Sequence, residues 1–403
     1  MISRRMGEKI KTGSAIRAAF NEAGRLRAQY GADAVFDLSL GNPGAPAPAR
    51  VREEARRLLD DPALDHGYMS DAGYEGVREQ VAGYLNRVYD AGCTREHVIM
   101  SVGAAGGINA VLCALLDRGD QVIVFRPYYP AYVNFIENWG GELVGIPPKG
   151  TDFQPDLEAL EAAMTPRTKV VMVNSPHNPT GTIYTQETVQ GIARILQGKE
   201  REYGHAIYLL SDEPYRELIY DGSRPVWWPH NYANTVVIYS FSKSLSLPGE
   251  RIGYVTLSPA LEEWKTVAQA VRLATGALGY VNAPAFFQRV VARCLDERVD
   301  LAYYERNRRT LYGALRELGF EAAEPRGAFY IWVKSPLERE SDFLDRARRH
   351  NLIFVAGSAF AWEGYARLSF CGSHEMLVGA RPALAALAED CGLRAATRKE
   401  ELR

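Results

Sequence analysis

The sequence has no long apolar run and no marked excess of charge of either sign. Its longest apolar segments, such as residues 110–116 and 121–125, are far shorter than the roughly 20 residues that a membrane-spanning helix needs. The formal net charge is only -2, whereas a nucleic acid or an anionic membrane surface attracts a strongly basic face. We therefore expect no membrane span and no nucleic-acid partner.

Close cysteine pairs and a secretory leader are also missing. The five cysteines are far apart in the sequence, and the basic N-terminus is not followed by the apolar stretch that a signal peptide contains. Isolated cysteines give neither a disulfide framework nor a zinc knuckle, and they fit a reducing compartment. The sequence thus predicts a cytoplasmic protein without a metal site.

Lysine is scarce, whereas arginine is plentiful. Only nine of the 47 basic residues are lysines, so a lysine inside an apolar segment is conspicuous. The chain has 403 residues, of which 47% are hydrophobic, and it is long enough for two or three domains with a large core.

Short β-branched runs alternate with amphipathic stretches through the middle of the chain. Expected strands lie at residues 97–102, 121–125, 142–146, 169–174, 206–211, 235–239 and 251–257. Expected helices lie between the earlier ones, at residues 107–116, 131–139 and 155–164. This alternation predicts an α/β fold with a buried, mostly parallel sheet and helices on both faces.

The C-terminal third has a different pattern. Residues 264–318 are mainly helical, and strands expected near 329–333, 352–355 and 366–369 indicate a smaller α+β region. A helix expected at residues 15–30 would pack with that region. We therefore predict a large domain at residues 46–285 and a discontinuous small domain formed by residues 1–45 and 286–403.

One lysine follows an apolar strand directly, in the segment Ser-Phe-Ser-Lys that ends at Lys243. Partial burial lowers the pKa of an amine and makes it a nucleophile suited to Schiff-base formation. A lysine that extends from a loop into solvent is the alternative. Arg251 is eight residues further on and could clamp a phosphate, although a structural ion pair would also explain it.

The same segment matches the Ser-x-x-Lys pattern of serine acyl enzymes, with Ser240 as the nucleophile. Such enzymes also need a downstream Lys-Thr-Gly strand. The Lys-Thr-Gly of this chain lies upstream, at residues 11–13, in polar surroundings.

Other polar groups follow further strands. The glycine-rich stretch at residues 103–107 precedes a helix and could bind a phosphate through backbone amides, or could be a plain turn. Asp212 follows the strand expected at residues 206–211, where an acid can pair with a protonated heterocycle or cap a turn. Asn178 lies in the turn Asn-Pro-Thr-Gly, and Tyr129 could stack on a planar ligand or pack in the core.

Together these groups match the needs of pyridoxal phosphate. In order and spacing, residues 37–372 resemble the class I and II aminotransferases of the aspartate aminotransferase superfamily, which have fold type I of the pyridoxal phosphate enzymes. The most specific part is Ser-Phe-Ser-Lys with an arginine eight residues later, preceded by Asn-Pro-Thr-Gly and Asp-Glu-Pro-Tyr. The fold implied is a mostly parallel seven-stranded sheet between helices, with a smaller α+β domain.

The resemblance implies a role for each matching residue. Lys243 would form the Schiff base with the cofactor and then move the substrate proton, and Asp212 would hold the pyridine nitrogen protonated. Asn178 and Tyr215 would bind the phenolic oxygen, and Tyr129 would stack on the ring. The phosphate would be bound by Ala104, Ala105, Ser240, Ser242, Arg251 and, from a second subunit, Tyr68. The substrate carboxylate would be bound by Arg367, Asn178 and Gly41.

The departures concern the substrate. Dicarboxylate-specific members carry a second basic residue at the position of Ala277 in one branch and of Ala105 in another, and both are alanine here. Arg126 and Arg272 are near in sequence and could substitute, or could be surface residues. The small, apolar segment 274–280 favours a neutral, aromatic or unusual amino acid.

We therefore expect a cytoplasmic, homodimeric, pyridoxal phosphate-dependent aminotransferase of amino acid metabolism. It would move an amino group from an L-α-amino acid to a 2-oxo acid by a ping-pong mechanism. The same cofactor also supports β- or γ-elimination, which is the main alternative. A cofactor-sensing regulator would need a DNA-binding domain, for which the stretch before Asp37 is too short.

Overall fold

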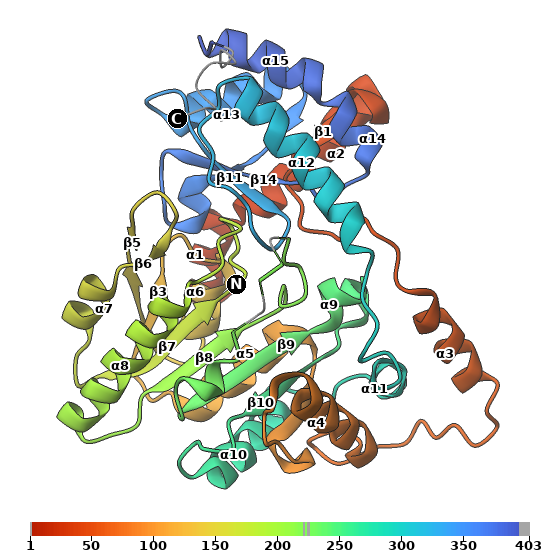
Figure 1. Ribbon diagram of the computed structural model, residues 1–403, viewed down its shortest axis with the longest axis vertical. Helices are drawn as coiled ribbons and strands as arrows, with labels where there is room; N and C mark the ends of the chain where they lie inside the picture. The colour runs from red at the N-terminus through yellow and green to blue at the C-terminus, as the bar shows by residue number, and fades with distance from the viewer. Residues whose placement is uncertain (1, 221, 224–225, 395–403) are drawn as a thin grey trace.

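A seven-stranded sheet forms the centre of the molecule (Figure 1). The computed structural model describes residues 2–220, 222–223 and 226–394. Six strands run parallel, and β10 is antiparallel to both of its neighbours. The order across the sheet is β2 (Val98–Ser101), β10 (Gly253–Leu257), β9 (Thr235–Ser240), β8 (Tyr208–Asp212), β7 (Thr168–Asn174), β3 (Gln121–Phe125) and β4 (Glu142–Ile146). The predicted α/β class and mostly parallel sheet are confirmed.

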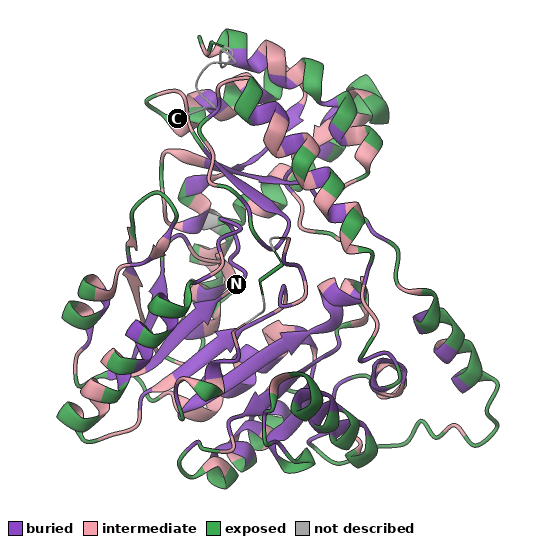
Figure 2. Ribbon diagram, in the orientation of Figure 1, coloured by how far each residue is buried: buried purple, intermediate pink, exposed green. Residues whose placement is uncertain are grey.

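The central strands are apolar on both faces because helices cover both faces. In β3, Val122 and Val124 point to one side and Ile123 to the other, and all three are buried. Figure 2 shows the inner strands buried along almost their whole length. One face packs against α5 (Gly103–Leu115), α6 (Ala131–Glu137) and α10 (Trp264–Ala277). The other packs against α7 (Leu157–Ala163), α8 (Gln186–Tyr203), α4 (Glu75–Tyr89) and α11 (Ala285–Ala292), and α3 (Ala49–Leu59) in turn packs on α11.

The glycine-rich stretch at residues 103–107 differs from its prediction as a loop before a helix. It forms the first turn of α5, which begins at Gly103. At Gly107 an added Cβ would lie only 3.1 Å from Val255 and 3.2 Å from Ile238 of the sheet. The glycine thus lets the helix approach the strands closely, and the amides of the first turn stay free of intrahelical partners.

A smaller body packs above the carboxyl edge of the sheet (Figure 1). Its three-stranded antiparallel sheet has the order β11 (Tyr330–Lys334), β14 (Tyr365–Ser369), β13 (Val355–Ala356), and β1 (Phe36–Asp37) pairs in parallel with β12 (Leu352–Ile353). Its helices are α12 (Leu301–Glu317), α13 (Glu340–Arg349), α14 (His374–Gly379) and α15 (Arg381–Asp390). As predicted, α2 (Ala15–Tyr30) packs here, through Ala23 and Leu26 against Ile353.

The first helix, α1 (Arg4–Thr12), is not among the predicted elements. Its N-cap is Ser3, whose hydroxyl accepts a hydrogen bond from the amide of Met6. It contacts α6 of the large body: Arg5 donates to Asn138, and Lys9 donates to Asn134. These contacts do not fit the assignment of residues 4–12 to the small domain. For the rest of the chain we propose the predicted boundaries at 45/46 and 285/286.

Within the described ranges, no helix combines the length and the apolar character that crossing a bilayer requires.

Candidate active site

One edge of the large sheet carries a cleft with a volume of about 270 Å³. The carboxyl ends of the six parallel strands and the start of β10 meet at this edge, because β10 alone runs in the opposite direction. The cleft brings together twelve of the thirteen predicted site residues: Gly41, Ala104, Ala105, Tyr129, Asn178, Asp212, Tyr215, Ser240, Ser242, Lys243, Arg251 and Arg367.

Tyr68 is the predicted residue that the chain does not bring to its own cleft. Its side chain is 97% exposed, on the segment between α3 and α4. Figure 1 shows α3 and this segment projecting away from the body.

Lys243 lies in the short helix α9 (Phe241–Ser244), which directly continues β9. Its Nζ donates to the carbonyl of Gly41 at 2.6 Å and lies 5.3 Å from the centre of the Phe329 ring. Burial is the main cause that lowers the pKa of Lys243 to about 8; the charge of Cys371 opposes this shift, and the nearby Arg367 and Arg251 contribute to it. A larger fraction of this amine is therefore uncharged near neutral pH than in an exposed lysine, which favours its action as a nucleophile.

Asp212 is the last residue of β8 and is deeply buried. Its Oδ2 accepts a hydrogen bond of 2.5 Å from the hydroxyl of Tyr132, whereas its Oδ1 has no partner. Burial raises the pKa of Asp212 to about 7, although the bond from Tyr132 acts to lower it and the charge of Glu213 adds to the rise. A buried carboxylate oxygen without a donor is costly, and its position in the cleft marks where a ligand N–H would bind.

The anion-binding end of the cleft combines a helix start, two hydroxyls and a guanidinium. The free amides of the first turn of α5 point toward this end, at the positive end of the helix dipole. Ser240 donates to the hydroxyl of Ser242 at 2.8 Å, and Arg251 lies against the backbone of Gly103. Ser240 ends β9 and pairs with Gly253 of β10, so Ser242 and Arg251 lie on the loop that joins these two strands. This set is suited to a phosphate group.

Arg367 of β14 enters the cleft from the small body and is 2% exposed. Its guanidinium donates to the side-chain oxygen of Asn178 at 3.1 Å and to the carbonyl of Ser39 at 2.6 Å, and its Nε has no partner. The ring centre of Tyr330 lies 4.3 Å away and that of Phe360 4.8 Å away. An arginine held in one orientation in this way is suited to bidentate carboxylate binding.

Gly41 closes the cleft over Lys243. A Cβ at this position would lie 1.9 Å from the hydroxyl of Tyr330, so only glycine fits the close approach of the two chain segments. The hydroxyl of Tyr330 is also 3.1 Å from that of Tyr215, which places Tyr215 beside the cleft.

Sequence reasoning missed Tyr132, Tyr330, Ser39 and Asn174. Asn174 ends β7 and donates to the carbonyl of Asp212 at 2.7 Å, while its oxygen accepts from the amide of Asn178. Tyr132 lies in the first turn of α6, just after Tyr129, and its ring meets that of Tyr129 at 5.6 Å. His177, assigned to the loop, does lie there, with Nδ1 2.8 Å from the hydroxyl of Thr180.

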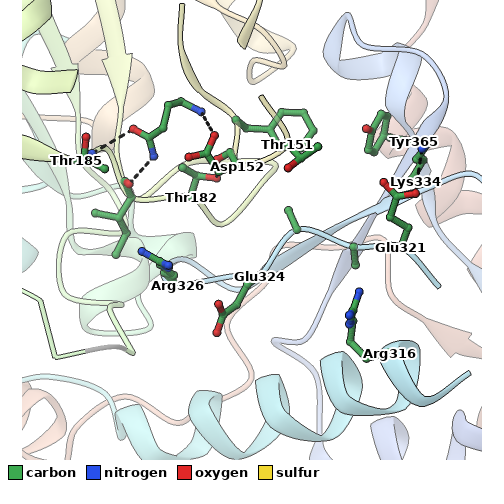
Figure 3. A pocket seen from close by; sticks show the side chains of 15 residues that line it. Thr151, Asp152, Thr182, Thr185, Arg316, Glu321, Glu324, Arg326, Lys334 and Tyr365 are labelled. Atoms are coloured by element: carbon green, nitrogen blue, oxygen red, sulfur yellow. Dashed lines mark hydrogen bonds and ion pairs between the residues drawn. The ribbon is translucent and has the colours of Figure 1, made fainter. Parts of the chain in front are cut away.

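A second cleft, of about 390 Å³, contains none of the predicted residues (Figure 3). Some of the charged groups that line it are paired, as Lys334 is with Glu321 at 2.9 Å and Glu324 with Arg308 at 3.8 Å. Among the described residues, none that lines this cleft has a buried side-chain polar atom without a partner, unlike Asp212 in the first cleft.

Comparison with known proteins decides the family. Residues 33–382 match the family described as aminotransferase class I and II. The chain belongs to the class I and II aminotransferases. It is 33% identical to the aspartate/prephenate aminotransferase of Thermus thermophilus over 90% of this chain and 93% of that protein. It is 31% identical to the aspartate aminotransferase of Thermotoga maritima over 86% of this chain and 89% of that one.

An aminotransferase crystal structure from Eubacterium rectale is also similar, with a TM-score of 0.93 and 36% identity over 97% of this chain and 99% of that one. The protein is therefore a pyridoxal phosphate-dependent aminotransferase of fold type I. The cleft fits this cofactor on its own chemistry. Asp212 offers an unpartnered acceptor for the ring nitrogen, Lys243 an amine of lowered pKa, and the α5 end a phosphate site.

Proposed function

We propose that this aminotransferase uses Lys243 as its covalent anchor and proton-transfer group, and that Asp212 is the charge partner of the cofactor. The observation that carries the proposal is the unpartnered Oδ1 of Asp212 in the same cleft as the buried amine of Lys243. Pyridoxal phosphate supplies an electron sink that stabilises negative charge at the substrate Cα. Asp212 strengthens that sink by keeping the ring nitrogen protonated.

Lys243 moves the proton in this proposal. Its Nζ takes the proton from the Cα of an L-α-amino acid, and its pKa of about 8 places the amine close to the optimum for a base at neutral pH. The carbonyl of Gly41, 2.6 Å away, orients Nζ before the substrate enters. The product 2-oxo acid leaves before the second substrate binds, so the cycle is ping-pong.

The remaining residues bind and orient. Arg367 binds the α-carboxylate, and Asn178 and Tyr215 bind the phenolic oxygen of the cofactor. Tyr129, which meets Tyr132 edge to face at 5.6 Å, stacks on the ring. The phosphate is bound by the amides of Ala104 and Ala105, the hydroxyls of Ser240 and Ser242, and Arg251.

The test is the covalent bond. Protein given pyridoxal phosphate should turn yellow, and borohydride should bleach the colour and fix the cofactor on the peptide that contains Lys243. Lys243→Ala should lose both properties, while Lys265→Ala, an exposed lysine of α10, should keep them. A wild-type protein that gains no visible band would contradict the proposal.

Elimination is separated from transamination by its products. An amino acid alone should convert the bound cofactor to its amine form in a single turnover. Steady release of ammonia and a 2-oxo acid without an acceptor would instead indicate a lyase.

We also propose a homodimer in the cytoplasm. The exposed Tyr68, on a segment that projects from the body, is suited to reach the phosphate site of a second subunit. The five free cysteines fit a reducing compartment. Sedimentation should give a dimer, and mixing the inactive variants Lys243→Ala and Tyr68→Ala should restore activity in the heterodimers that carry one complete site.

A further inference from the structure

The cleft has only as many cations as the cofactor and one carboxylate require. The basic residues that line it are Lys243, Arg251 and Arg367. In the proposed function, on which this inference rests, they serve the covalent bond, the phosphate and the α-carboxylate. Among the described residues of this chain, no further cationic side chain lines the cleft to receive a second carboxylate.

The two arginines that could have substituted face elsewhere. Arg272 of α10 points toward Asp71, with Nε 3.8 Å from its carboxylate. The side chain of Arg126 lies over Gly145 of the edge strand β4, where an added Cβ would be 2.4 Å from its Nε. Neither of them lines the cleft.

Apolar side chains from three helices line the remaining wall. They are Ile16 of α2, Ile108 of α5 and Phe135 of α6, which we call the apolar wall. Ile16 also packs against the buried cluster that includes Trp332 and Phe360. Phe360 in turn lies under the guanidinium of Arg367. Through Ile16, the wall therefore adjoins the packing beneath the carboxylate-binding arginine.

The segments before and after Ile16 are each attached to one of the two bodies of the molecule. Contacts between α1 and α6 fix the segment before it to the large body, and α2 fixes the segment after it to the small body. Ile16 is half-buried between these two attachments, at the start of α2.

We propose that the apolar wall selects amino donors with an uncharged, apolar side chain, such as leucine, methionine or phenylalanine. An ionised side-chain carboxylate placed against it would lose its hydration without gaining a cation, which is strongly unfavourable. An apolar side chain would instead gain by leaving water, in proportion to the area buried. The names of the aspartate aminotransferase relatives describe those proteins, whose specificity this chain does not share in our proposal.

The experiment is a single-turnover comparison of donors on the dimeric holoenzyme. Conversion of the bound cofactor to its amine form is followed by absorbance with L-leucine, L-methionine, L-phenylalanine, L-aspartate and L-glutamate. The best apolar donor should exceed both acidic ones in rate constant over dissociation constant by about 100-fold or more. Equal or faster conversion with L-aspartate or L-glutamate would overturn the inference and leave the proposed function intact. Conversion with no amino acid at all would instead contradict the proposed function.

A charge placed on the wall tests the mechanism of selection. Ile16→Lys should raise the preference for L-aspartate over the best apolar donor by about tenfold or more. Ala18→Lys adds the same charge at an exposed position of the same helix and should leave the preference unchanged. An unchanged preference in Ile16→Lys would show that Ile16 does not face the substrate side chain and would overturn its assignment to the selective wall.

Discussion

Asp212 and Glu213 are adjacent acids in opposite environments. Both side chains are at least 95% buried, and strand alternation sends them to opposite faces of the sheet. Glu213 binds Arg216, with 2.5 Å between Oε2 and Nε, and accepts from the hydroxyl of Ser211. Asp212 has no cation, only the hydroxyl of Tyr132, and one of its oxygens is unpartnered.

This difference in partners indicates that the charge of Glu213 is structural and that the charge of Asp212 serves ligand binding. The positive partner of Glu213 is part of the chain: Arg216 sits among aromatic rings, 4.7 Å from Tyr239, and also donates to Tyr254. Glu213 is therefore compensated whenever the protein is folded. The positive partner of Asp212 must arrive with a ligand, so of these two acids Asp212 is the one that has no cationic partner in the folded chain.

The largest expected effect is the loss of activity on substitution of Asp212, the unpaired acid. Asp212→Asn removes the negative charge that holds the ring nitrogen protonated, so we expect activity (kcat/KM) to fall by roughly 10³- to 10⁴-fold. Steady-state kinetics with an apolar donor measures this. A loss smaller than about tenfold would mean that the charge of Asp212 is not used.

A substitution of Glu213, the paired acid, should lower the stability of the fold. Glu213→Gln leaves Arg216 buried without its counter-charge, and we expect the free energy of unfolding to fall by about 3–4 kcal/mol. Urea denaturation of the variant measures the loss. Adding Arg216→Met in the same chain should recover part of it, because the uncompensated cation is then gone. Equal stability of the single variant and the wild type would contradict the assigned role of the pair.

The free energy of unfolding of the cofactor-free protein should depend on pH, because burial of the charged Asp212 carboxylate is unfavourable. Burial raises the pKa of Asp212 from 3.8 to about 7, so the folded protein binds a proton more tightly than the unfolded chain does. The protonated carboxyl of Asp212 therefore makes its full contribution to the free energy of unfolding below about pH 4, and this contribution is lost as the pH rises to about 7. Cofactor-free Asp212→Asn avoids this loss and should be more stable than the wild type at pH 8 by roughly 2–4 kcal/mol.

The measurement is urea unfolding of both cofactor-free proteins at pH 5 and pH 8. The difference between them should be larger at pH 8. A difference that stays constant with pH would show that Asp212 titrates normally in the fold.

The smallest expected effect comes from the neutral partner of Asp212. Tyr132→Phe removes the 2.5 Å hydrogen bond that acts to lower the pKa of the carboxyl, and we expect cofactor affinity to fall by about tenfold. Titration with pyridoxal phosphate measures this. Tyr203→Phe, which removes a hydroxyl bonded to the carbonyl of Met164 away from the cleft, should leave the affinity unchanged.

The sheet and most of the site could be predicted because both depend on local patterns. Buried parallel strands are continuous apolar runs, and the residues that follow them meet at one edge. Lys243, Asp212 and Asn178 were found in this way, and the structure brings them into one cleft.

What was missed depends on contacts between distant segments. Tyr330 meets Tyr215 across 115 positions of sequence, and no local pattern encodes that pairing. The helix α1 escaped prediction because it is short and strongly charged; its apolar residues Met6 and Ile10 are exposed, and it makes polar contacts with α6. Ile16 drew no attention because an isoleucine at the start of an amphipathic helix is usually a core residue.

The reversed direction of β10 has a mechanical consequence. Lys243 and Arg251 lie on one hairpin loop that is fastened at both ends by paired strands, whereas Arg367 is carried by the other body. A hinge displacement of the small body would therefore change the grip on the substrate carboxylate and leave the spacing between the two cofactor anchors unaltered. In the proposed function, one reactant could therefore leave and the next could enter without a change in the spacing of the groups that would bind the cofactor.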